Sequence, residues 1–135
     1  PKRDWNSDVC SSDLFLLMQV LSLKILGEPA SKANSRKMVY IRGKPLFIKS
    51  EKALAYAESF KRQTIASKVF FADEDVVVTI RIWYASRRPD LDESLILDLL
   101  QGVAYANDRQ VKEKHIYWMG VDKNEPRCEI EVQKK

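Results

Sequence analysis

The sequence predicts a single α+β domain in which two helices pack against a mixed β-sheet. A chain of 135 residues is long enough to bury one hydrophobic core. Apolar residues alternate at the period of a strand in several segments and recur at helical spacing in two others. The elements follow the order strand, hairpin, helix, strand, helix, strand, strand, which is typical of helices that cover a mixed sheet.

The first predicted elements are a strand and a hairpin. Residues 20–26 alternate as a strand does, and a Gly-Glu-Pro sequence at 27–29 ends it. Residues 38–41 and 45–48 are predicted to pair as a hairpin around an Arg-Gly-Lys turn at 42–44. The buried face of the first strand would hold Leu21, Leu23 and Ile25.

Two helices are predicted at residues 51–67 and 93–101. The side chain of Ser50 is suited to cap the first helix and that of Asp92 the second, which Gly102 would end. The first helix would bury Leu54, Ala57, Phe60 and Ile65, and we assign Tyr56 to the core rather than to a base-stacking pair. The second would be buried through Leu95, Leu99 and Leu100.

Three further strands complete the predicted sheet, at residues 76–84, 111–119 and 127–132. The first of them is rich in β-branched and aromatic residues and leads directly to an acidic segment. The end of a strand is a common place for active-site residues. The last strand would turn Cys128, Ile130 and Val132 toward the core.

Charge is unevenly distributed along the chain, whose formal net charge is +4. Residues 24–62 hold ten Lys or Arg and three Glu, a balance of +7 that leaves −3 for the remainder. A basic lobe beside an acidic site is what a metal-dependent nuclease needs. The alternative interpretation of such a charge run is a solvated helix face.

Cysteine usage, histidine content and hydropathy exclude several classes of protein. Cys10 and Cys128 lie far apart without metal-type spacing, which favours a reducing, cytoplasmic compartment with both thiols free. His115 has no second histidine to share a metal, and we interpret it as a structural or surface residue. No apolar run approaches the ~20 residues of a membrane span.

Residues 1–14 do not resemble the start of a domain. They are polar, lack periodicity and are similar to translated sequencing-adapter sequence. We interpret them as a non-native or artefactual leader and place the domain at residues 15–135.

One acidic segment carries the chemistry. Asp90 and Asp92 stand one residue apart, and Asp108 follows after a short apolar stretch. Acids set this close repel one another, so a site that gathers them usually holds a cation or a proton. Carboxylates suit hard cations such as Mg²⁺ or Mn²⁺, which often sit against phosphate. Arg87 and Arg88 would handle an anionic substrate, so the pattern suggests metal-assisted chemistry at a phosphodiester.

These residues resemble the core of the RusA family of Holliday junction resolvases. The resemblance rests on Arg-Pro-Asp-Leu-Asp at 88–92, on the following helix with Asp98, and on Asn-Asp-Arg-Gln-Val at 107–111. The sequence Gly-Glu-Pro-Ala-Ser-Lys-Ala-Asn-Ser-Arg at 27–36 is similar to a loop near the N-terminus of that family. The match runs from about residue 20 to residue 132.

The resemblance implies a RusA-like fold and an endodeoxyribonuclease that resolves four-way DNA junctions by paired nicks in recombination and repair. It also implies a homodimer with Mg²⁺ as cofactor, Mn²⁺ being the alternative. The matching acids, Asp90, Asp92 and Asp108, would hold the metal and act in catalysis. The residues that would contact DNA are Lys32, Arg36, Lys37, Arg87, Arg88 and Arg109.

The chain departs from the family pattern at three positions. Glu93 stands where asparagine is usual, Ile96 where the catalytic lysine is usual, and Asn107 in place of the first acid of the later pair. Glu93 would serve as an added metal ligand. A replacement for the missing cation would come from Arg109, Lys112 or Lys114.

Two alternatives to the nuclease stay open at this point. Ile96 and Asn107 favour a protein that grips junctions and cuts them slowly or not at all. In the other alternative the acids only cap helices and pair with Arg87, Arg88 and Arg109 in a structural protein of the same fold. Metal titration distinguishes the structural protein from the other two candidates. Junction cleavage distinguishes the nuclease from the binding protein.

Overall fold

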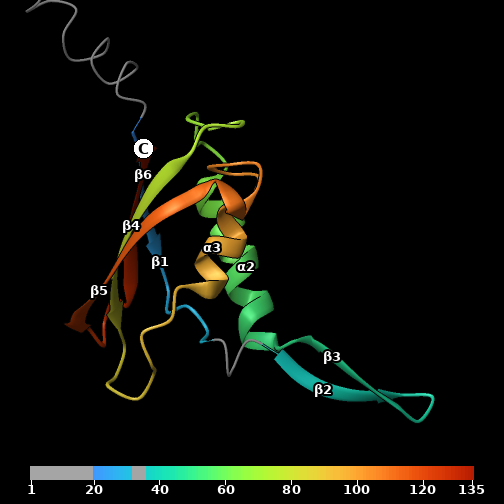
Figure 1. The fold of residues 1–135 in the computed structure, drawn as a ribbon. Helices are drawn as coiled ribbons and strands as arrows, with labels where there is room; N and C mark the ends of the chain where they lie inside the picture. The colour runs from blue at the N-terminus through green and yellow to red at the C-terminus, as the bar shows by residue number, and fades with distance from the viewer. Residues whose placement is uncertain (1–19, 32–35) are drawn as a thin grey trace, which may run out of the picture.

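The computed structural model describes residues 20–31 and 36–135, which form a four-stranded sheet, a two-stranded hairpin and two helices (Figure 1). The predicted single α+β domain with helices against a mixed sheet is confirmed. The predicted leader at residues 1–14, together with Cys10 and Lys32, lies outside the described residues. Within the described ranges, no helix is long and apolar enough to cross a membrane.

One parallel strand pair makes the sheet mixed. The strand order is β1 (Leu21–Leu26), β6 (Arg127–Lys134), β4 (Val76–Tyr84) and β5 (Val111–Val121). β4 pairs with β6 antiparallel and with β5 parallel. Parallel neighbours cannot be joined by a tight turn, so the chain crosses over between them. That crossover, residues 85–110, contains all three predicted acids.

Alternation along the central strand places one face of the sheet in the core. Every second residue of β4 is buried, and alternate residues of β6 are buried beside it. The two helices lie together over one face of this sheet (Figure 1). The inward orientation predicted for β6 is confirmed for Cys128, Ile130 and Val132, which join Leu21 and Ile25 of β1 in the core.

Helix α2 (Glu51–Thr64) begins where predicted, and the Ser50 Oγ accepts a hydrogen bond from Ala53 N at 3.2 Å. Its predicted end at residue 67 is wrong, and so is the predicted burial of Leu54 and Ile65, which are 53% and 87% exposed. The side chains that pack inward follow a spacing of three and four residues along a different face, and they are Ala53, Tyr56, Phe60 and Thr64.

Helix α3 (Ser94–Leu100) is shorter than the predicted 93–101. Glu93 takes the N-cap position, yet Asp92 still serves the first turn, because its Oδ1 accepts a hydrogen bond from Ser94 N at 2.9 Å. Ile96 is 0% exposed and packs in the hydrophobic core. An isoleucine at this position therefore fills the interior. Leu95 and Leu100 are buried beside it as predicted, and Leu99 is half-buried.

The hairpin of β2 (Arg36–Ile41) and β3 (Lys44–Lys49) forms a sheet of its own, as predicted. Arg42 and Gly43 make its turn, with φ angles of 54° and 79° in the left-handed region that a two-residue hairpin turn requires. Figure 1 shows the hairpin projecting from the start of α2, away from the four-stranded sheet. Every residue of its two strands is exposed except Val39, which is half-buried.

We expect the substitution Ile96→Lys to destabilise the protein, because it places an ammonium group in the hydrophobic core. An unpaired buried charge costs roughly 3 kcal/mol or more. Urea unfolding followed by circular dichroism measures the change. Asp98→Lys, on the exposed side of the same helix, is the matched control and should alter stability little. Equal stability of the two variants would contradict the burial of position 96.

Candidate functional site

The loop after β4 is clamped by the last residue of that strand. The Tyr84 hydroxyl donates a hydrogen bond to the Asp90 carbonyl oxygen at 3.0 Å and accepts one from Asp92 N at 3.3 Å. Burial raises the pKa of the Tyr84 phenol, and the nearby charges of Asp92 and Glu28 add to the rise. The phenol therefore stays protonated at neutral pH and holds the loop that carries both acids.

Glu28 fixes the beginning of the same loop. Its Oε2 accepts a hydrogen bond from Ala85 N at 2.7 Å, and its Oε1 lies 3.2 Å from Lys52 Nζ. The Glu28 side chain is largely buried, so this charge-assisted hydrogen bond to the backbone is shielded from water. Glu28 was not predicted as a site residue. Its one signal in the sequence is its place in the motif at residues 27–36.

The turn that carries Asp108 is held by a buried glutamine. The 3₁₀ turn η2 (Asp108–Gln110) is capped by Asn107, whose Oδ1 accepts a hydrogen bond from Arg109 N at 3.0 Å. Gln110 Oε1 accepts hydrogen bonds from two backbone N–H groups before the turn, and its Nε2 donates to two carbonyl oxygens of residues 71–74. The glutamine of the Asn-Asp-Arg-Gln sequence therefore anchors the turn to the segment before β4.

The three predicted acids lie in two places. Asp90 and Asp92 follow the C-terminal end of β4, whereas Asp108 precedes the N-terminal end of β5. These are opposite ends of a parallel strand pair, and α3 lies in the chain between them (Figure 1). Within residues 20–31 and 36–135, no group of three or more Asp, Glu, His or Cys side chains is placed to hold a metal ion.

A groove of about 250 Å³ lies between α3 and the start of β5. Lys114 Nζ lies 2.7 Å from Glu93 Oε2, so this ammonium links the start of α3 to the groove that Asp108 lines. Of the three candidate replacement cations, Lys112 and Lys114 line the groove. The full lining is Leu97, Asp108, Val111, Lys112, Glu113 and Lys114.

The predicted arginines do not neutralise the exposed acids. Asp90 and Asp108 have exposed side chains, and neither carboxylate has a hydrogen-bond or ion-pair partner among the residues that the structure describes. The Arg87 guanidinium instead lies 5.7 Å from the ring centroid of Trp118. Arg88 and Arg109 are exposed. Asp90 and Asp108 therefore form none of the arginine pairs of the structural alternative among the described residues, whereas Asp92 does serve the first turn of α3 as that alternative expects.

The remaining predicted residues belong to other elements of the structure. Arg36 and Lys37 belong to the hairpin, where Lys37 Nζ lies 3.7 Å from a Glu51 carboxylate oxygen. His115, interpreted as a structural or surface residue, is exposed, and its Nε2 lies 2.6 Å from Glu113 Oε2. Cys128 is a buried free thiol, and burial raises its pKa to about 11.

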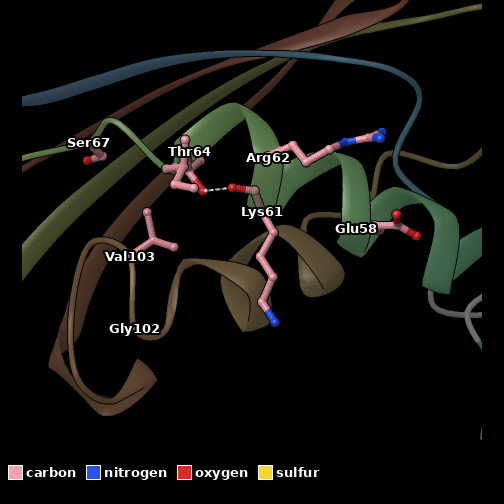
Figure 2. A pocket seen from close by; sticks show the side chains of 8 residues that line it. Glu58, Lys61, Arg62, Thr64, Ser67, Gly102 and Val103 are labelled. Carbon is pink, nitrogen blue, oxygen red and sulfur yellow. Dashed lines mark hydrogen bonds between the residues drawn. The ribbon is translucent and has the colours of Figure 1, made fainter.

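A larger groove, of about 570 Å³, lies between the C-terminal end of α2 and the turn after α3. Figure 2 shows the Lys61 and Arg62 side chains pointing in different directions from α2 and the Val103 side chain lying below Thr64. Ser67 Oγ is buried here without a hydrogen-bond partner among the described residues. None of the predicted acids lines this groove, so it is separate from the candidate site.

Comparison with known proteins gives one family match. The family model described as Endodeoxyribonuclease RusA matches residues 27–133, which is most of the chain. A search of curated proteins found no match. The matched region contains the Asp90–Asp92 loop, the η2 turn, α2 and the hairpin.

Tyr84→Phe should loosen the acid loop while the core stays packed, because the ring remains and only the hydroxyl is lost. Removal of these two hydrogen bonds should lower stability by about 1–2 kcal/mol. Hydrogen exchange read by mass spectrometry should be faster in residues 85–92. Tyr105→Phe is the matched control, since it removes a buried hydroxyl that bonds the Leu97 carbonyl instead. A loop that exchanges equally in both variants would contradict the clamp.

Proposed function

Because the chain belongs to the RusA endodeoxyribonuclease family, we propose that it is a structure-specific nuclease that resolves four-way DNA junctions by paired nicks. The observation that carries the proposal is the family match, which spans both acid-bearing segments. The clamped loop of Asp90 and Asp92 supports it, because catalytic groups must be held in a fixed geometry. Cleavage of a labelled junction with and without Mg²⁺ tests it directly.

A divalent metal is the cofactor that the family implies, and we assign Mg²⁺ to this role, with Mn²⁺ as the alternative. The donor chemistry fits, because hard cations prefer exposed carboxylate oxygens such as those of Asp90 and Asp108. Asp90, Asp92 and Asp108 would hold the ion, with Glu93 as an added ligand. When bound, it supplies an activated water and neutralises charge on the phosphate. The described residues hold no preassembled group of three ligands, so Asp90 and Asp92 are the core of the proposed metal site and Asp108 is tested separately below.

The protein's own groups would hold the DNA backbone at this site. Tyr84 would keep the acid loop in one conformation. Lys114 would bring positive charge to the phosphate, because its ammonium lies at the start of α3 and lines the Asp108 groove. It would thus take the role of the family lysine, which the buried Ile96 cannot fill. The exposed Arg88 and Arg109 would contact neighbouring phosphates.

A homodimer suits this substrate and is part of the proposal. A four-way junction presents two equivalent strands, and a two-fold symmetric dimer presents two equivalent sites. One cut by each subunit gives the paired nicks.

A junction-binding protein that cuts slowly or not at all is the second candidate function. The core burial of Ile96 favours it, as does the lack of a preassembled group of three acids in the described part of the chain. The junction assay separates the two candidates. A nuclease nicks the junction only when metal is present, whereas a binding protein retards the junction in both conditions and cuts it in neither.

Asp90→Asn and Asp92→Asn should each abolish metal-dependent cleavage, because each removes a carboxylate ligand. Junction binding should stay equal or improve, since a negative charge near phosphate is lost. Calorimetric titration with Mn²⁺ should show weaker metal binding by both variants. Asp98→Asn, which alters an exposed acid of α3, is the control and should cut normally.

A wild-type cleavage rate in either loop variant would contradict the assignment of these acids. Asp108→Asn tests the third ligand separately, because this acid lies at the other end of the strand pair. Normal cleavage by this variant, alongside inactive loop variants, would confine the metal to the Asp90–Asp92 loop.

Lys114→Gln should slow single-turnover cleavage by roughly 10²-fold, because it removes a preorganised charge from the phosphate site. Lys123→Gln is the control, since this exposed lysine lies in the turn between β5 and β6. Arg109→Gln and Lys112→Gln belong in the same series. A loss of rate confined to one of these two variants would move the role away from Lys114.

A further inference from the structure

The β2–β3 hairpin has two chemically different faces. Directly opposed residues of an antiparallel pair share a face, and successive pairs alternate between faces. The pairs Met38 with Phe47 and Tyr40 with Pro45 therefore lie on one face. Tyr40 and Phe47 are diagonal neighbours there, 68% and 67% exposed. The opposite face holds four aliphatic side chains and two lysines, which are Val39, Ile41, Leu46, Ile48, Lys37 and Lys44.

The hairpin is also strongly basic. Residues 36–49 contain five Lys or Arg and no acidic residue. Arg36 and Lys49 are paired with each other at the base of the aromatic face, Arg42 lies in the turn, and Lys37 and Lys44 belong to the opposite face. Cations thus stand at both ends of two exposed rings. Basic side chains that flank stacking platforms are the combination that binds single-stranded or unpaired nucleic acid.

The hairpin leaves the body near the candidate site. β3 runs into α2 through Ser50, and Lys52 in the first turn of α2 pairs with Glu28. Glu28 in turn holds Ala85, the first residue of the acid loop. Figure 1 shows the hairpin and the loop between β4 and α3 at the same end of the molecule. A ligand bound at Asp90 and Asp92 would therefore lie at the same end of the molecule as the hairpin.

The positive charge of the hairpin indicates which kind of partner binds its aromatic face. A second copy of the hairpin would bring five more cations against the first five, which opposes pairing of the two. A polyanion is attracted by the same charges. Rings exposed to this degree also favour a partner with planar apolar surfaces. DNA with unpaired or unstacked bases has both properties.

We propose that the aromatic face of the β2–β3 hairpin stacks, through Tyr40 and Phe47, on bases exposed at the branch point of junction DNA. The flanking cations hold the adjacent phosphates, so the hairpin distinguishes branched DNA from a continuous duplex. This inference rests on the proposed function, because it takes branched DNA as the substrate.

The test compares the full-length protein with the double variant Tyr40→Ala/Phe47→Ala, without divalent metal so that the DNA stays intact. The probes are a four-way junction with 2-aminopurine at the branch point and a linear duplex with the same base. The variant should bind the junction roughly ten-fold or more weakly, because stacking on two rings is lost. Its affinity for the duplex should change less than about two-fold, and the 2-aminopurine signal seen with the wild type should disappear.

Two matched variants control for the change. Ile41→Ala/Leu46→Ala truncates as many exposed side chains on the opposite face and should bind like the wild type. Tyr40→Phe/Phe47→Tyr keeps both rings and should also keep the junction affinity. Circular dichroism and sedimentation velocity on every variant report fold and oligomeric state.

The outcomes separate this inference from the proposed function. If the wild type binds the junction and Tyr40→Ala/Phe47→Ala binds it with the same affinity, the hairpin proposal is overturned and the proposed function is not. A smaller oligomer in that variant would make the hairpin a contact between copies of the chain and would also overturn it. A wild-type protein that neither binds nor cuts junctions would overturn the proposed function, and the hairpin proposal with it.

Discussion

The parallel pairing of β4 with β5 is the constraint on which the rest of the structure depends. Because parallel neighbours need a crossover, residues 85–110 must travel back along the strand pair, and α3 buries the middle of that path. Asp90 and Asp92 precede α3 in the chain, and Asp108 follows it after residues 101–107. Seven residues of helix span about 10 Å. The two acid-bearing segments are instead held by Tyr84 at the end of β4 and by the contacts of Gln110 with the segment before β4.

The expected departures from the family pattern at Ile96 and Glu93 have different structural consequences. Ile96 gives its position to the core, so no charge from α3 reaches the acids there. Glu93, the neighbouring departure, holds Lys114 at 2.7 Å and brings an ammonium from β5 to the start of the helix. A half-exposed pair of this kind adds little stability. Its effect is positional, because it places a cation beside the acid loop by a route other than the helix.

Local signals carried most of the fold prediction. Alternation located β4 and β6, a serine capped α2, and an Arg-Gly turn closed the hairpin. The inward face of α2 was misjudged at Leu54 and Ile65, because local pattern does not say which face meets the rest of the core. The contacts of Glu28 with Ala85 and of Gln110 with Phe71 join residues 57 and 39 positions apart, so no local pattern reveals them. Likewise, the short sequence separation of Asp92 and Asp108 did not reveal that the crossover places them at opposite ends of the β4–β5 pair.

The hairpin raises a problem of stability that its chemistry resolves. A lone two-stranded hairpin is marginal in water, and this one exposes six large apolar side chains without cover from the described residues. The hairpin therefore lacks the stabilisation that burial of those side chains would contribute to its folding free energy. Pairing of two hairpins would bury these side chains, but it would also bring like charges together, and their repulsion opposes the pairing. Under the proposal for the hairpin, junction DNA would cover the two rings with its bases and neutralise the lysines and arginines with its phosphates.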